Sequence, residues 1–193
     1  MINSKVLNII GLITVFLGIS MIPSSFWSLL ESSEYSSNDL EFSNFLAILL
    51  SSCITIGSGL FLYAITYNRK KKRNDRELQS KDGFAIVTLA WIFMAIFSAL
   101  PYYFSTSSLS FTNAFFESMS GLTTTGATIF GHPSTSEIEN LPKGILFWRS
   151  FTPFIGGMGI IVFSIAILPM LGIGGVQLFR AEVAGPVAEK ITP

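Results

Sequence analysis

The sequence is poor in the side chains on which disulfide-rich proteins and most enzymes depend. Among its 193 residues it has one cysteine, Cys53, and one histidine, His132. A single cysteine excludes an intrachain disulfide, and Cys53 is expected to be a small packing residue. Asp, Glu, Lys and Arg together make up only 12% of the chain, and they leave four long stretches without any formal charge.

These four uncharged stretches are residues 6–30, 42–68, 83–116 and 150–179. A helix that crosses a bilayer needs about 20 mostly apolar residues, so each stretch can hold one. The third has room for a span at residues 84–104 and about a dozen residues more. The first follows a basic residue, as a signal peptide does, but its length and the lack of an obvious cleavage site favour a retained helix. The sequence therefore predicts an all-α integral membrane protein with four transmembrane helices.

The predicted spans also lack the groups that chemistry at membrane depth requires. None contains an internal histidine, aspartate or glutamate, so acid–base pairs and metal ligands are missing from them. Glu117 and His132 lie between the third and fourth spans and do not make a site by themselves. The glycines at 172–175 lack the strand and the lysine of a phosphate-binding loop, so no organic cofactor is expected. The sequence argues against an enzyme.

Basic residues gather in one connection, which predicts the orientation of the chain. Residues 68–82 carry seven basic side chains, whereas residues 31–41 carry four acidic side chains and no basic one. Short loops rich in Lys and Arg stay in the cytoplasm, so both chain ends are expected there and residues 105–141 outside. Lys143 and Arg149, at the outer start of the last span, go slightly against this rule. A basic cluster can also bind nucleic acid or lipid headgroups. Between two spans its role in topology is favoured, and no nucleic-acid partner is expected.

A short segment between the third and fourth spans is expected to enter the membrane and return. Residues 111–120 form an amphipathic segment that is about 15 Å long as a helix, half the thickness of the hydrocarbon core. Gly121 and a polar turn follow it. Irregular backbone at membrane depth is tolerated only where it is buried in protein or lines a water-filled cavity. The sequence therefore predicts one re-entrant pore helix and a filter loop.

The polar turn contains the groups that a dehydrated cation needs. Thr123, Thr124 and Thr125 offer three successive carbonyls and three hydroxyls, and Gly126 permits unusual backbone angles. The preceding helix aims its negative end at the same place. Glu117 is interpreted either as an ordinary solvated glutamate or as a support that adds negative potential, from the outer mouth or from behind the filter. An external Ser/Thr/Gly loop is the alternative for the whole turn.

The last span contains a second cluster, formed by Gly156, Gly157 and Gly159. Small residues let a neighbouring backbone approach closely, or let a helix bend beside a pore. Packing is favoured over a hinge. Arg149 is expected to reach outward from the membrane edge.

Five motifs follow one another through the second half of the chain. They are Phe-Glu-Ser-Met-Ser-Gly-Leu-Thr-Thr-Thr-Gly-Ala-Thr at 116–128, Trp-Arg-Ser at 148–150, Gly-Gly-Met-Gly-Ile-Ile-Val at 156–162, Ile-Leu-Pro at 167–169 and Gly-Val-Gln-Leu-Phe-Arg-Ala-Glu at 175–182. In this order they resemble the Trk/Ktr potassium-uptake family, specifically its TrkH-type membrane subunit. The resemblance implies four helix–pore loop–helix units around one pore in the inner membrane, usually in a homodimer. It also implies K+ as the transported ion and a cytoplasmic nucleotide-binding ring as regulatory partner.

By this resemblance the filter consists of Thr123, Thr124, Thr125 and Gly126, with Ala127 at its outer edge. Residues 1–80 would be an amino-terminal hairpin with its basic loop, and residues 81–193 one helix–pore loop–helix unit with a cytoplasmic tail. The chain has one such unit, so we expect an amino-terminal portion or a truncated product. Its partners would be membrane lipid and the remaining pore units, or further copies of itself. The alternative is a non-conducting membrane scaffold or an inactive fragment.

Overall fold

The computed structural model describes residues 4–32, 38–70, 80–105, 109–131 and 137–167. The basic connection at 71–79, His132 and the motifs after residue 167 lie outside these ranges. Every regular element in the described part is helical, which confirms the predicted all-α class. The elements are α1 (Ser4–Ser20), α2 (Ile22–Ser32), α3 (Asn38–Lys70), α4 (Ser80–Ser98), α5 (Leu100–Phe104), α6 (Phe111–Leu122), the 3-10 turn η1 (Ile138–Asn140) and α7 (Lys143–Ile167).

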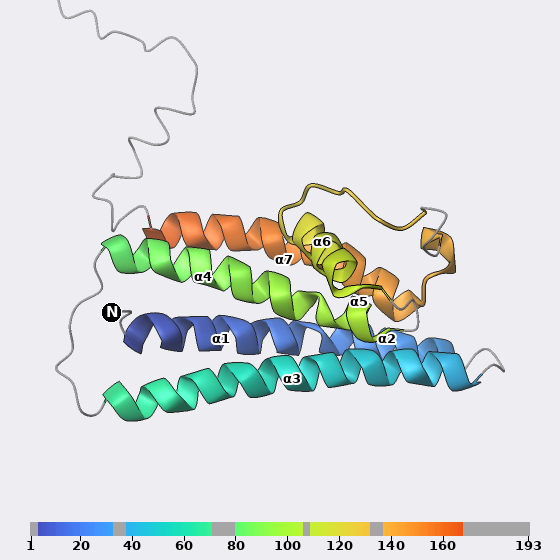
Figure 1. The fold of residues 1–193 in the computed structure, drawn as a ribbon, viewed down its shortest axis with the longest axis horizontal. Coiled ribbons are helices and arrows are strands. Elements are labelled where there is room, and N and C mark those ends of the chain that lie inside the picture. The colour runs from blue at the N-terminus through green and yellow to red at the C-terminus, as the bar shows by residue number, and fades with distance from the viewer. Residues whose placement is uncertain (1–3, 33–37, 71–79, 106–108, 132–136, 168–193) are drawn as a thin grey trace, which may run out of the picture.

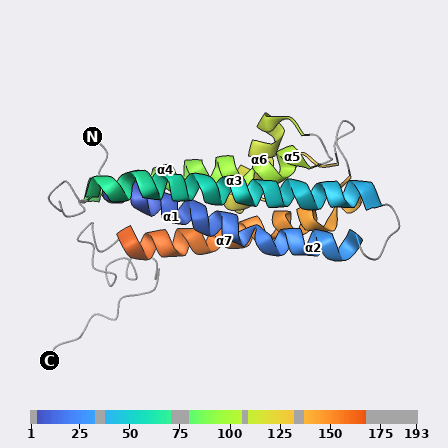
Figure 2. The same cartoon turned by 90° about the horizontal axis from the view of Figure 1, so that it is seen from below.

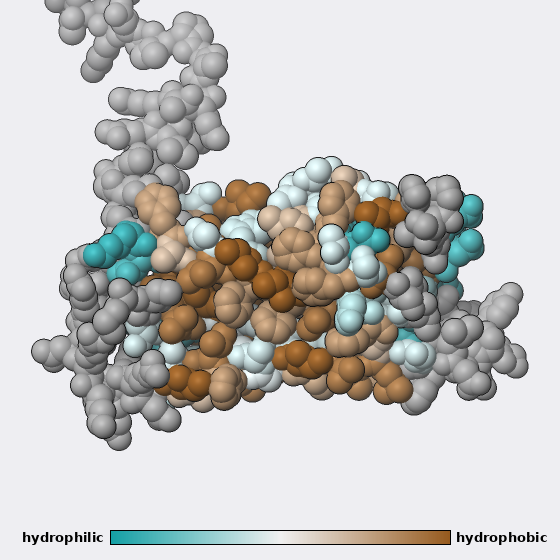
Figure 3. Space-filling view, in the orientation of Figure 1, coloured by the Kyte–Doolittle hydropathy of each residue, from teal (hydrophilic) through white to brown (hydrophobic). Residues whose placement is uncertain are grey.

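Four helical segments are long and apolar enough to cross a membrane: Ser4–Leu29, Ser43–Tyr67, Lys81–Phe104 and Lys143–Ser164. They correspond to the four predicted spans and lie side by side in one bundle (Figure 1). On the face shown in Figure 3, apolar residues cover most of the middle of the bundle, and strongly hydrophilic residues lie mainly toward its ends. The chain is a multi-pass membrane protein.

The first and third spans each consist of two helices, where the sequence suggested one. Pro23 is the second residue of α2, and Pro101 is the second residue of α5. Proline has no backbone N–H, so it cannot bond to the carbonyl four residues earlier, and a helix bends or breaks there. As a result α2 leaves the line of α1 and lies beside α7 (Figure 2).

The first hairpin is held by direct contact between backbones. A methyl group on Gly11 would lie 2.8 Å from the carbonyl oxygen of Gly59, and one on Gly59 would lie 2.7 Å from that of Gly11. Gly18 meets the backbone of α3 in the same way, so these three glycines allow α1 and α3 to pack closely. Gly57 faces open space instead. Cys53 is exposed on α3, so its interpretation as a packing residue was wrong.

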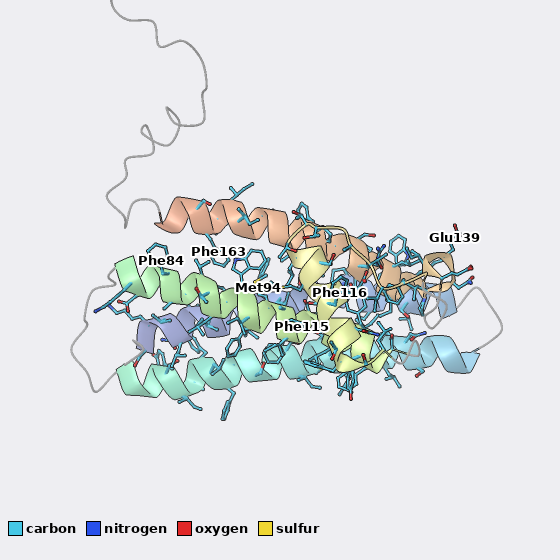
Figure 4. All side chains as sticks on the ribbon, turned by 45° about the horizontal axis from the view of Figure 1, so that its top comes forward. Phe84, Met94, Phe115, Phe116, Glu139 and Phe163 are labelled. Carbon is cyan, nitrogen blue, oxygen red and sulfur yellow. The ribbon has the colours of Figure 1, made fainter. Side chains whose placement is uncertain are left out.

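The second half of the chain places a short helix against the long ones. α6 is set at an angle to the bundle and contacts α4, α5 and α7 (Figure 1). It is two residues longer than expected because Gly121 continues the helix. Its length of about 18 Å is still well below the thickness of the hydrocarbon core. Figure 4 shows Phe115 and Phe116 of α6 between Phe84 and Phe163 on one side and Glu139 at the other end of the bundle.

Candidate functional site

The helix α6 turns its small and polar side chains inward and its larger aromatic side chains outward. Ala114, Glu117 and Ser118 are buried, whereas Phe111 and Phe116 are about half exposed. In water this arrangement would be unfavourable, but lipid tails are as apolar as the protein interior, so small residues at the contact allow close packing.

Hydrogen bonds fix the inner face of α6 to its neighbours. The hydroxyl of Ser118 donates to the carbonyl of Ala95 at 2.8 Å and also meets the hydroxyl of Ser98. The indole Nε1 of Trp148 donates to the carbonyl of Ser98 at 3.0 Å. Trp148 is fully buried. These bonds join α4, α6 and α7 at the level of the helix that precedes the polar turn.

Residues 123–128, here named the threonine turn, begin with a Schellman-type helix end. The backbone N–H of Thr124 donates to Gly121 O at 2.9 Å, and that of Thr125 donates to Ser120 O at 3.0 Å. This motif needs a residue with left-handed backbone, usually glycine. Thr124 occupies that position with a φ of 56°. A β-branched residue in this region is a conformational outlier, and such strain gathers at functional sites.

Further hydrogen bonds organise the oxygens of the threonine turn. The hydroxyl of Thr123 donates to Met119 O at 2.8 Å and lies 2.8 Å from the hydroxyl of Thr125. Ser120 donates to the carbonyl of Ala127 at 2.5 Å. Two of the three expected threonine hydroxyls are therefore already engaged within the chain. All six residues of the turn are exposed, and Gly126 adds a second left-handed position with a φ of 74°.

Glu117 lies behind the threonine turn. Its side chain is 3% exposed, so the interpretation as a solvated glutamate is wrong. The carboxylate accepts hydrogen bonds from the hydroxyl of Thr128 at 3.0 Å, the backbone N–H of Ile129 at 3.2 Å and Nε of Arg149 at 2.7 Å. Because the helix extends to Leu122, Glu117 lies more than a turn before its end, where an acidic residue opposes the macrodipole less than in the last turn.

Sequence reasoning missed the partner of Glu117, since Arg149 was expected to reach toward the membrane surface. The guanidinium instead points inward to the carboxylate. The positions of the two charges contained a usable signal. Glu117 is the seventh residue of α6 and Arg149 the seventh of α7. Two helices that start near the same end of the bundle bring such residues to a similar depth, where opposite charges pair rather than stay alone.

The three glycines of α7 have different surroundings. Gly156 is buried, and a methyl group on it would lie 2.6 Å from the carbonyl carbon of Leu122 and closer still to its oxygen. Gly156 thus contacts the last residue before the threonine turn. Nothing lies within 4 Å of a methyl group on Gly157, and only Phe163, at 3.9 Å, meets one on Gly159. Gly156 therefore packs against the end of α6, whereas Gly157 and Gly159 do not.

Comparison with known proteins places these residues in a family. The family model TrkH, described as a cation transport protein, matches residues 51–192. The Trk system potassium uptake protein TrkH of Halomonas elongata is 37% identical over 190 residues, which cover 97% of this chain and 36% of that protein. TrkH of Vibrio parahaemolyticus is 51% identical over 124 residues, 63% of this chain and 24% of the relative. TrkH of Escherichia coli is also 51% identical, over 123 residues. The chain spans between a quarter and just over a third of the length of these curated relatives.

Proposed function

Because the chain belongs to the TrkH family of cation transport proteins, we propose that it forms part of the ion path of a potassium transporter. In this proposal the threonine turn is one segment of a cation filter, in which Thr123 to Gly126 coordinate the ion and Ala127 forms the outer edge. The relatives are named as potassium uptake proteins, which supports K+ as the ion.

The observation that carries the proposal is the direction of the peptide groups in the turn. The N–H groups of Thr123, Thr124 and Thr125 all donate back to carbonyls of α6. In a planar trans peptide the carbonyl oxygen points opposite to the N–H of the next residue. The carbonyls of Thr123 and Thr124 therefore point away from α6, on residues that are exposed. Oxygens of this kind replace the water around a cation in a filter.

The remaining walls of the path must come from other polypeptide. A filter is a ring of oxygens, and this turn supplies one side of it. Lipid cannot cover exposed peptide groups, because it offers them no hydrogen bonds. In the proposal, α6 is a re-entrant pore helix, and further pore units or further copies of this chain close the ring. A cytoplasmic nucleotide-binding ring, as the resemblance implies, would regulate the assembly.

The orientation belongs to the same proposal. α1 begins, α3 ends, α4 begins and α7 ends at one end of the bundle (Figure 1). The basic residues at 68–82 connect α3 with α4, and loops of this kind stay in the cytoplasm. Both chain ends are then cytoplasmic, α6 lies in the outer half of the inner membrane, and the threonine turn opens to the outside.

Ion uptake tests this function directly. Rubidium uptake would be measured in cells that lack potassium uptake and express this chain, or any longer reading frame that contains it. Gly126→Ser should lower uptake and the preference for rubidium over sodium, since a side chain strains the left-handed position by about 1–2 kcal/mol. Gly131→Ser is the matched control, because Gly131 is also left-handed (φ 88°), exposed and in open space. Absence of uptake, or equal effects of the two variants, would favour a non-conducting scaffold.

A further inference from the structure

The ion pair between Glu117 and Arg149 is connected to the far side of the threonine turn. Resting on the proposed filter function, we propose that Arg149, together with Thr152, is a positioning element: through Glu117 it fixes the exit of the turn and so sets ion selectivity.

The first step is that one carboxylate holds three consecutive residues at the exit of the turn. Glu117 accepts from the hydroxyl of Thr128 and from the N–H of Ile129. The N–H of Phe130 donates to the same threonine hydroxyl at 3.1 Å. Phe130 is itself buried and packs against Tyr102, with ring centroids 6.4 Å apart. The chain therefore leaves the turn along a path that the Glu117 carboxylate determines.

The second step concerns the charge of that carboxylate. Glu117 is buried, and the guanidinium of Arg149 is 27% exposed. A buried carboxylate without a partner takes up a proton or pulls in other donors, and either change alters the hydrogen bonds it accepts. Arg149 supplies the opposite charge next to the buried carboxylate, and the same carboxylate accepts from Thr128 and Ile129. It also cancels the negative charge, so the pair positions the turn without attracting cations to it.

The third step explains why Arg149 is held in place. Pro153 lies inside α7 and has no N–H for the carbonyl of Arg149, four residues earlier. The hydroxyl of Thr152 donates to that carbonyl at 3.0 Å and fills the gap. The side chain of Thr152 also lies against Gly121, where a methyl group would meet its Cβ at 3.0 Å. Thr152 thus joins the Arg149 backbone to the end of α6.

A purely structural ion pair would change folding or abundance alone, whereas a positioning element changes selectivity in protein that reaches the membrane. The test measures rubidium and sodium uptake per molecule of protein in the membrane. Arg149→Met and Glu117→Gln should each lower the rubidium-to-sodium ratio by about tenfold, equivalent to about 1.4 kcal/mol. Arg149→Lys keeps the charge but loses the planar guanidinium, so it should restore the ratio in part. Thr152→Val should shift the ratio in the same direction by less.

Matched controls remove the same charges at exposed positions nearby. Lys143→Met removes a positive charge from the first turn of α7, and Glu139→Gln removes a negative charge from η1. Both should leave the ratio unchanged. If Arg149→Met and Lys143→Met give the same ratio, Arg149 does not position the filter. If Arg149→Met does not reach the membrane, Glu117→Gln decides in its place, and a ratio equal to that of the unmodified protein overturns the proposal.

A second measurement does not depend on transport. Ala127 is exposed at the edge of the turn, and Cys53→Ser leaves a background without cysteine. The rate at which a membrane-impermeant thiol reagent labels Ala127→Cys reports the conformation of the turn. Arg149→Met should change this rate several-fold and Lys143→Met should not. If the unmodified protein moves no rubidium, the filter function fails, while labelling still shows whether Arg149 holds the turn. If uptake occurs but neither the ratio nor the labelling responds to Arg149, only the positioning role fails.

Discussion

The contact between Gly156 and the end of α6 leads to a sharp prediction about how tightly the threonine turn is supported. In Gly156→Ala the new methyl group would lie 2.6 Å from the carbonyl carbon of Leu122 and 2.9 Å from its Cα. These are backbone atoms, so no side-chain rotation relieves the overlap, and α6 or α7 must move by about 1 Å. Overpacking of a well-packed core costs about 1–3 kcal/mol, and a backbone clash belongs at the upper end.

Gly157→Ala supplies the matched comparison, because nothing lies within 4 Å of the added methyl group. Both substitutions gain the same helix propensity, about 1 kcal/mol in favour of alanine, so this contribution cancels between them. Unfolding of the purified protein in detergent should show Gly156→Ala less stable than Gly157→Ala by about 3 kcal/mol. Rubidium uptake should fall in the first variant alone, since the displaced Leu122 directly precedes Thr123. Equal stability of the two variants would show that α6 does not rest on Gly156.

Two further predictions concern the same region. Thr124→Gly should stabilise the protein by about 1–2 kcal/mol in the same unfolding assay, because it removes the left-handed strain at the Schellman position. Thr125→Gly, at a position without positive φ, should instead destabilise the protein by about 0.5–1 kcal/mol. If Thr125→Gly were the more stable of the two variants, the backbone strain assigned to Thr124 would be wrong. Trp148→Phe should lower the free energy of unfolding by about 1–3 kcal/mol, because the carbonyl of Ser98 loses its buried hydrogen-bond donor. Trp27→Phe, at a side chain that is 48% exposed, should change stability far less.

The sequence was sufficient to predict the spans and the short helix because hydropathy and length decide them. Every backbone group inside a bilayer must be hydrogen-bonded, and the helix is the element that makes all of these bonds within one apolar stretch. The division of the first and third spans follows from Pro23 and Pro101, and it could also have been predicted. These features depend on residues close together in the chain.

The support of the threonine turn could not be predicted with the same ease, because it depends on contacts between distant residues. The sequence suggested an unusual backbone conformation at Gly126. The end of α6 also requires left-handed backbone at Thr124, which the residue type does not indicate because threonine rarely adopts it. Glu117 was interpreted either as a solvated glutamate or as a support that adds negative potential. Its effect changes once Arg149 comes within 2.7 Å, and only the packing of α6 on α7 brings the two together.

The pairing of Glu117 also changes which groups can favour a cation at the turn. With the carboxylate neutralised by Arg149, what remains is the peptide dipoles. The N–H of Thr124 donates to the carbonyl of Gly121, and it belongs to the same peptide group as the carbonyl of Thr123. In the same way the N–H of Thr125 donates to the carbonyl of Ser120, and its peptide group contains the carbonyl of Thr124. A hydrogen bond from an N–H to a carbonyl aligns the two peptide dipoles, and such chains polarise one another. The partial negative charge at the C-terminal end of α6 therefore extends to the exposed carbonyl oxygens of the turn. The proposed filter therefore attracts cations through neutral groups whose geometry the buried ion pair holds in place.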